Sequence, residues 1–139
     1  MKFSARVQNS EGRHKVLMRR GDNEQSIVIA PNPGGFGSSA SGGELLFLAL
    51  ATCYCNDLYR EAGKRGIKVE GVEVEVDGNF DAPGVPGTNV TYRAKVIAQA
   101  NEADIEKLMM ITDTVAEIQN TLRMETPVVL REVQAISRR

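Results

Sequence analysis

The chain has 139 residues, of which 42% are hydrophobic and 25% charged, and its formal net charge is −1. This composition is ordinary for a globular protein, and we expect a single domain over residues 1–139. Near-neutral charge without a basic cluster argues against nucleic acid as a partner. The N-terminal segment Met1–Arg6 lacks an apolar signal core, so we expect a cytoplasmic protein.

The first thirty residues alternate between apolar and polar side chains, which is the period of half-buried strands. The predicted strands and the turns between them cover residues 2–8, 9–12, 15–19, 20–23 and 25–30. Strands joined by such short turns pair antiparallel, so these three form a meander. Pro31 and Pro33 end it, because proline cannot donate to a strand ladder.

A glycine–serine loop then leads into a long central helix, predicted over Gly42–Ala62. Ser41 and Glu44 have the spacing of a capping box, in which each side chain bonds the other residue's backbone N–H. From Leu45 to Cys55 nearly every residue is apolar, so other structure must wrap this helix. The run is too short to span a bilayer, which needs about 20 residues. We therefore expect a central buried helix of a soluble fold, with no membrane partner.

The second half of the chain predicts a hairpin, two helices and a final strand. The hairpin strands are Lys68–Phe80 and Val90–Ala98, whose polar faces carry acidic and basic residues respectively, and opposite charges favour their pairing. Asn101 caps the second helix, and a short helix follows through Leu122. After the break at Thr126 and Pro127 we predict a strand over Val128–Val133. The fold class is α+β, with helices packed on antiparallel sheet.

Both cysteines, Cys53 and Cys55, lie in the apolar part of the central helix. Their side chains point about 200° apart around the helix axis, so they cannot bond to each other and we expect free thiols. The chain has one histidine and no CxxC pair, so we predict neither a zinc site nor another metal or cofactor. A cysteine in an apolar helix is ordinarily a packing residue, which leaves the role of Cys55 open.

The stretch Ser41–Cys53, SGGELLFLALATC, resembles the start of the central helix in the OsmC/Ohr family of osmotically induced and organic hydroperoxide resistance proteins. The family pattern there is S-P-x-E-L-L-x-A-x-L-A-x-C after a glycine-rich loop. The resemblance implies an OsmC-like fold and an intertwined homodimer with two sites at the subunit interface. In active members a thiolate attacks a hydroperoxide, a second cysteine resolves the sulfenic acid as a disulfide, and an Arg and a Glu stabilise the thiolate.

Carried onto this chain, the resemblance gives Cys53 the attacking position. The second cysteine position falls on Ala116, so the usual resolving thiol is missing. Cys55 is no obvious replacement, because it points to the other side of the helix. If the chain is an enzyme, it is a thiol peroxidase that lacks the usual resolving cysteine.

The residues that stabilise the thiolate are less well matched. Strict register puts Gly43 at the acidic position, with Glu44 one residue later. Glu44 is a possible acidic partner of the thiol, although the capping box already explains it. The activating arginine has three candidates in the N-terminal meander, namely Arg13, Arg19 and Arg20.

Two functions are compatible with these residues. The first is a thiol-dependent hydroperoxide reductase in which Cys53 attacks and an external thiol, such as glutathione or a dihydrolipoyl protein, regenerates it. The alternative is a catalytically silent OsmC-like dimer that binds an apolar small molecule at the subunit interface. Ala116 and Gly43, which replace two site groups, favour the alternative.

Overall fold

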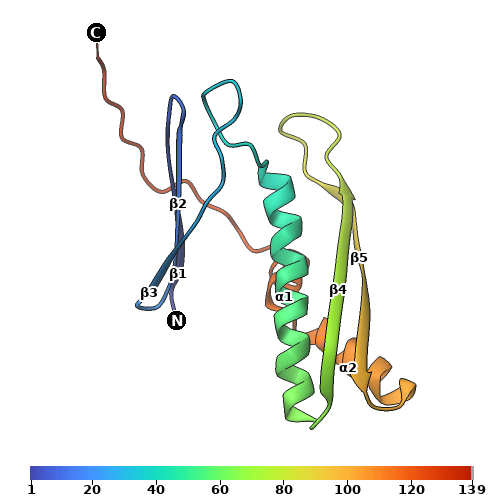
Figure 1. Ribbon diagram of the computed structural model, residues 1–139. Coiled ribbons are helices and arrows are strands. Elements are labelled where there is room, and N and C mark those ends of the chain that lie inside the picture. The colour runs from blue at the N-terminus through green and yellow to red at the C-terminus, as the bar shows by residue number, and fades with distance from the viewer. Residues whose placement is uncertain (139) are drawn as a thin grey trace. The chain divides into compact units, whose positions relative to one another are not determined.

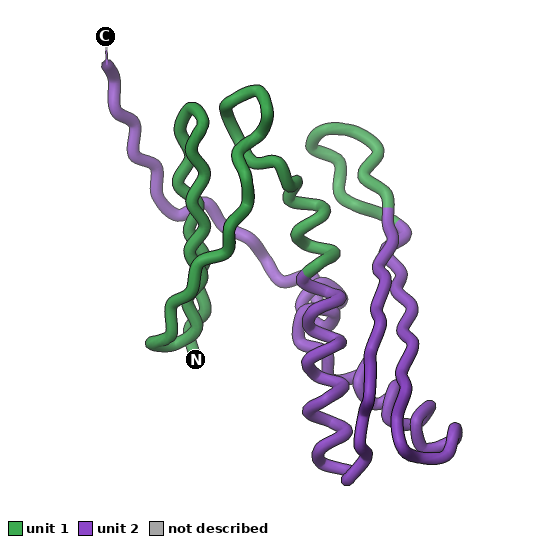
Figure 2. The backbone as a smooth tube through the Cα atoms, viewed as in Figure 1, with its two compact units in different colours: residues 1–48, 79–88 green, residues 49–78, 89–139 purple. Residues whose placement is uncertain are grey.

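The computed structural model describes residues 1–138, and the chain divides into two compact units (Figures 1 and 2). Unit 1 comprises residues 1–48 and 79–88, and unit 2 comprises residues 49–78 and 89–139. The described residues form three helices and antiparallel sheets, which makes this an α+β protein, as predicted. Within residues 1–138, none of the helices combines the length and apolarity that crossing a membrane requires.

Unit 1 is built on the predicted antiparallel meander, which is confirmed. Its strands, in sheet order, are β1 (Phe3–Ser10), β2 (Arg13–Arg20) and β3 (Asn23–Ile27). Val7 pairs with Val16, which pairs in turn with Ile27. β3 ends three residues earlier than predicted, because the chain leaves β2 to pair with the following loop. There Ala30 O accepts from Ser39 N at 3.0 Å.

Helix α1 (Gly42–Lys64) belongs to unit 1 at its start and to unit 2 from Ala49 onward. The predicted capping box is present: Ser41 Oγ accepts from Glu44 N at 3.1 Å, and Glu44 Oε1 accepts from Ser41 N at 2.9 Å. The bond from the Ser41 backbone lowers the pKa of Glu44. Close packing also explains the glycine at position 43, because a Cβ there would lie 2.8 Å from the Phe80 ring.

Removal of this cap tests how much of the stability of α1 is set locally. We expect Ser41→Ala to lower the free energy of unfolding by about 1 kcal/mol, because an N–H of the first turn loses its acceptor. Urea denaturation followed by circular dichroism measures the change. Ser39→Ala, at an exposed serine two residues earlier, is the control. Equal effects of the two substitutions would contradict a specific cap.

The core of unit 2 lies between α1, the hairpin of β4 (Lys68–Asn79) and β5 (Thr88–Gln99), and α2 (Glu102–Val115). Leu58 of α1 and Leu108 of α2 are fully buried at its centre. Partly buried residues that pack around them include Ile67, Val69, Val72, Val74, Tyr92, Ala94, Val96 and Met109. The polar hairpin face carries the predicted cross-strand charges, since Arg93 contacts Glu75 at 2.7 Å and Asp77 at 2.9 Å.

Helix α3 (Glu117–Arg123) follows α2 after the buried Ala116. The predicted cap of α2 is confirmed, because Asn101 Oδ1 accepts from Asp104 N at 2.9 Å. Asp113 near the end of α2 accepts hydrogen bonds from Arg123 at 2.7 Å and from Tyr92 OH. These bonds attach the end of α3 to α2 and the hairpin.

The predicted strand over Val128–Val133 is wrong. Residues 126–138 contain neither helix nor strand, and their apolar side chains are exposed, including Val128 at 99% and Leu130 at 83%. An extended segment becomes a strand only when a neighbouring strand bonds its N–H and C=O groups. The valine residues favour a strand here, but residues 1–138 supply no partner strand for this segment.

The apolar first half of α1 is covered only in part. Leu50 and Tyr54 are buried, as expected for a wrapped helix, whereas Leu45 and Leu48 are 38% and 59% exposed. Residues 1–138 of one chain therefore leave part of this apolar run exposed.

Candidate functional site

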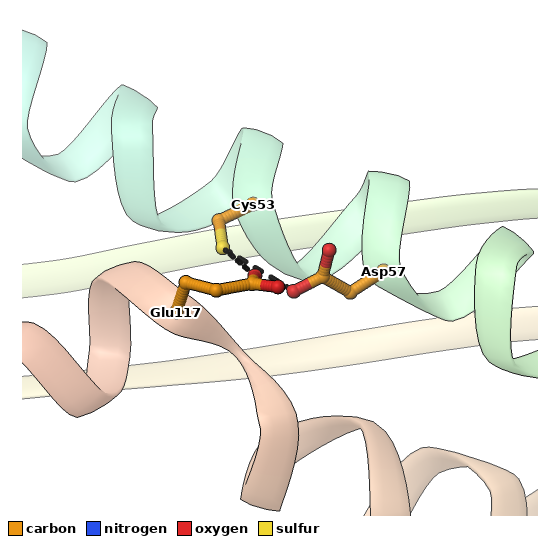
Figure 3. Close-up of side chains that lie close together, drawn as sticks. All are labelled: Cys53, Asp57 and Glu117. Carbon is orange, nitrogen blue, oxygen red and sulfur yellow. Dashed lines mark hydrogen bonds between the residues drawn. The ribbon is translucent and has the colours of Figure 1, made fainter. Parts of the chain in front are cut away.

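Cys53 lies half-buried on α1 and faces two carboxylates (Figure 3). Its Sγ is 3.4 Å from Asp57 Oδ2 and 3.5 Å from Glu117 Oε2. Asp57 follows Cys53 by four residues, so both lie on one face of the helix. Glu117 is the first residue of α3, and Gln119 holds that helix against α1 by donating from Nε2 to Leu50 O at 3.0 Å.

Arg60 supplies the positive charge of this cluster. Its Nη1 lies 3.1 Å from Asp57 Oδ1 and 2.9 Å from Glu117 Oε1, so one guanidinium bridges the carboxylates of α1 and α3. Its Nε lies 3.3 Å from Glu61 Oε2. Arg60 follows Asp57 by three residues, the spacing at which helical side chains meet. We refer to Cys53, Asp57, Arg60 and Glu117 as the thiol cluster.

The surroundings keep Cys53 protonated. Burial is the largest cause that raises the pKa of its thiol to about 11; the charge of Asp57 and the hydrogen bonds to both carboxylates act in the same direction, and the Ile118 backbone acts in the opposite one. Burial also raises the pKa of Asp57, whereas the hydrogen bond with Asp57 holds the pKa of Glu117 well below its usual range. At neutral pH Cys53 is therefore a thiol, which is a much weaker nucleophile than a thiolate.

The residues named from the resemblance have different surroundings. Ala116 is buried, and the next residue, Glu117, is the one whose side chain meets Cys53. Glu44 has its hydrogen bonds in the capping box. Cys55, a free thiol like Cys53, lines a shallow groove of about 260 Å³ with residues of α1 and β4.

The sequence prediction missed Asp57, Arg60 and Glu117. The first two have a local signal, because residues four and seven positions after Cys53 share its helix face. Glu117 has none, since 64 residues separate it from Cys53. The candidates Arg13, Arg19 and Arg20 lie on β2 in unit 1, where Arg19 pairs with Glu24.

The cluster also contains metal-binding atom types. Cys53 Sγ and one carboxylate oxygen each from Asp57 and Glu117 all lie within 4.8 Å of one another. Chemically, the arrangement offers one thiol, two acids and one guanidinium in contact with both acids.

Comparisons with known proteins agree on the fold. The family model described as "OsmC-like protein" matches residues 35–131. An OsmC-like protein from Mycoplasma pneumoniae is 16% identical, with a TM-score of 0.64 over 88% of each chain. An organic hydroperoxide resistance protein from Legionella pneumophila is 17% identical, with a TM-score of 0.58 over 88% of this chain and 90% of that one. No curated protein matches the chain.

Proposed function

Since the chain belongs to the OsmC-like protein family, we propose that it reduces hydroperoxides through the thiol of Cys53. The observation that carries the proposal is the contact of this thiol with Asp57 and Glu117, two carboxylates from separate helices that Arg60 bridges. Cys53 also occupies the attacking position in the family pattern. The fold shared with a protein described as an organic hydroperoxide resistance protein gives further support.

In the proposed reaction, the sulfur of Cys53 attacks the terminal oxygen of the hydroperoxide. The O–O bond breaks, Cys53 becomes a sulfenic acid, and the thiol proton leaves with the alkoxide as an alcohol. An external thiol then condenses with the sulfenic acid and releases water, and a second thiol frees Cys53 by disulfide exchange. The reductant is external because Ala116 occupies the resolving position of the family pattern, and the side chain from α3 beside Cys53 is the carboxylate of Glu117.

Brief exposure to an organic hydroperoxide in the presence of dimedone tests this function. Dimedone traps sulfenic acids, and peptide mass mapping locates the adduct. We expect the adduct on Cys53, in the wild type and in Cys55→Ser alike. Unmodified Cys53, or peroxide consumption that survives in Cys53→Ser, would overturn the proposal.

The alternative function is a catalytically silent dimer that binds an apolar small molecule. The raised pKa of Cys53 favours it, because a buried thiol beside two acids is poorly activated. This alternative predicts stoichiometric binding of an apolar fluorescent probe together with the absence of any dimedone adduct. Peroxide turnover that depends on Cys53 would exclude it.

We also propose that the chain forms one OsmC-like domain that assembles as a homodimer in the cytoplasm, where free thiols persist. Exposed apolar residues support a dimer, namely Leu45 and Leu48 on α1 and the C-terminal Val128, Val129, Leu130, Val133 and Ile136. Scattered single apolar residues are normal on a surface, but groups of this kind mark interaction sites.

Light scattering tests the assembly. We expect a mass of twice the 15.2 kDa chain. We expect removal of residues 126–139 to weaken the dimer, because its exposed apolar side chains would no longer be available to pack against a second subunit. A monomer at all protein concentrations would refute the dimer.

A further inference from the structure

We propose that Cys53, Asp57 and Glu117 form a binding site for a divalent metal ion of the zinc class, and that the bound ion blocks the reaction of Cys53 with hydroperoxide. Binding itself does not depend on the proposed peroxidase function, because it needs only the three donor atoms. The cysteine and histidine spacing of the sequence gave no reason to expect such a site.

The donor atoms are already spaced as ligands of one ion. The Sγ of Cys53 is 3.4 Å from Asp57 Oδ2 and 3.5 Å from Glu117 Oε2. With Zn–S of about 2.3 Å and Zn–O of about 2.1 Å, tetrahedral geometry separates a sulfur and an oxygen ligand by about 3.6 Å. Both sulfur–oxygen separations are therefore close to those of ligands on one ion. Three protein ligands leave the fourth position open for water.

The charge of the cluster also favours a cation. Among residues 1–138, the ion pairs of Asp57 and Glu117 all involve Arg60, so two carboxylates share one guanidinium. Glu61 beside them is already held by Lys64 at 3.0 Å and by Arg65 at 3.1 Å. Metal binding would replace the proton of the Cys53 thiol, forming a sulfur–metal bond and releasing the proton to solvent.

The side chains of the site differ in exposure, so that one carboxylate is held in place and the other is reached from solvent. The Asp57 side chain is 8% exposed, whereas those of Glu117 and Arg60 are 60% and 42% exposed. Arg60 must turn outward to admit the ion. It can retain a partner when it does so, because its Nε already contacts Glu61 Oε2 at 3.3 Å.

Titration with a metal alone tests the site, with reduced, chelator-treated protein and no peroxide. Cd²⁺ and Co²⁺ serve as probes, because their bonds to thiolate produce charge-transfer absorption. We expect one ion per chain and a thiolate band that persists in Cys55→Ser and disappears in Cys53→Ser. Asp57→Asn and Glu117→Gln should each weaken binding at least tenfold, while Glu73→Gln, at an exposed carboxylate of β4, leaves it unchanged.

A second measurement links the site to Cys53 chemistry. Zn²⁺ should protect Cys53 from alkylation over the same concentration range in which it binds. Metal uptake that is unchanged in Cys53→Ser, or no uptake by the wild type, would overturn the inference. If Asp57→Asn does not fold, Glu117→Gln alone tests whether the carboxylates bind the metal. Glu117 is exposed, so its substitution should leave the fold intact. Dimedone labelling is measured separately, so each proposal can fail without the other.

Discussion

Asp57→Asn is expected to speed the alkylation of Cys53 at pH 8 by roughly tenfold, which corresponds to one unit of thiol pKa. The pKa of Cys53 is raised to about 11 by burial first and then by the carboxylates beside it. Removal of the carboxylate 3.4 Å from Sγ removes a charge that opposes the thiolate. Rates of iodoacetamide reaction as a function of pH, in a Cys55→Ser background with chelator present, measure the shift.

The sign of the pH dependence follows from the same arrangement. In the wild type the rate should rise about tenfold per pH unit from neutral pH toward the pKa, because only the thiolate reacts. Arg60→Gln should slow the reaction, because it leaves two carboxylates without their guanidinium. Glu73→Gln removes one exposed charge elsewhere in unit 2 and should change nothing. Slower alkylation in Asp57→Asn would show instead that Asp57 accepts the thiol proton.

The sequence alone supports only part of this site. Cys53 can be identified as a site residue because it belongs to the sequence pattern of one helix. Asp57 and Arg60 can be identified because their spacing places them on the same face of that helix. Glu117 depends on tertiary structure, because Gln119 bonds the Leu50 carbonyl and Arg123 bonds Asp113, and these bonds hold α3 against α1 and α2. The family pattern pointed to Ala116, which is buried, whereas the side chain that meets the thiol belongs to the next residue, Glu117.

The elements of the fold also differ in whether their own residues or distant residues determine them. Alternation predicts β1, β2 and the long hairpin, and the spacing of Ser41 and Glu44 predicts the start of α1, since each signal lies within the element itself. The segment Val128–Val133 is rich in the β-branched residues that favour strands, and it forms no strand. A strand also requires a neighbour to accept and donate its hydrogen bonds, and local pattern carries no information about that neighbour.

Leu58→Ala is expected to lower the free energy of unfolding by about 3–5 kcal/mol, as for other fully buried leucines. Leu58 is 0% exposed and packs with Tyr54, Ala62 and Leu108 where α1, the hairpin and α2 meet. The cost combines lost burial with the cavity that the surrounding helices and strands cannot fill. Urea denaturation at one fixed protein concentration measures it, and a loss below about 1 kcal/mol would contradict this core.

Leu48→Ala is the matched control, with the same chemical change on the same helix at a side chain that is 59% exposed. In an isolated chain it should cost roughly 0.5 kcal/mol or less, because little burial is lost. In a dimer that covers this part of α1, the cost should rise, and it should appear as a weaker dependence of stability on protein concentration. A small cost for Leu48→Ala at every concentration would mean that no second subunit covers the apolar start of α1. Leu58→Ala thus measures the stability of the core within one chain, and Leu48→Ala measures whether a second subunit packs on α1.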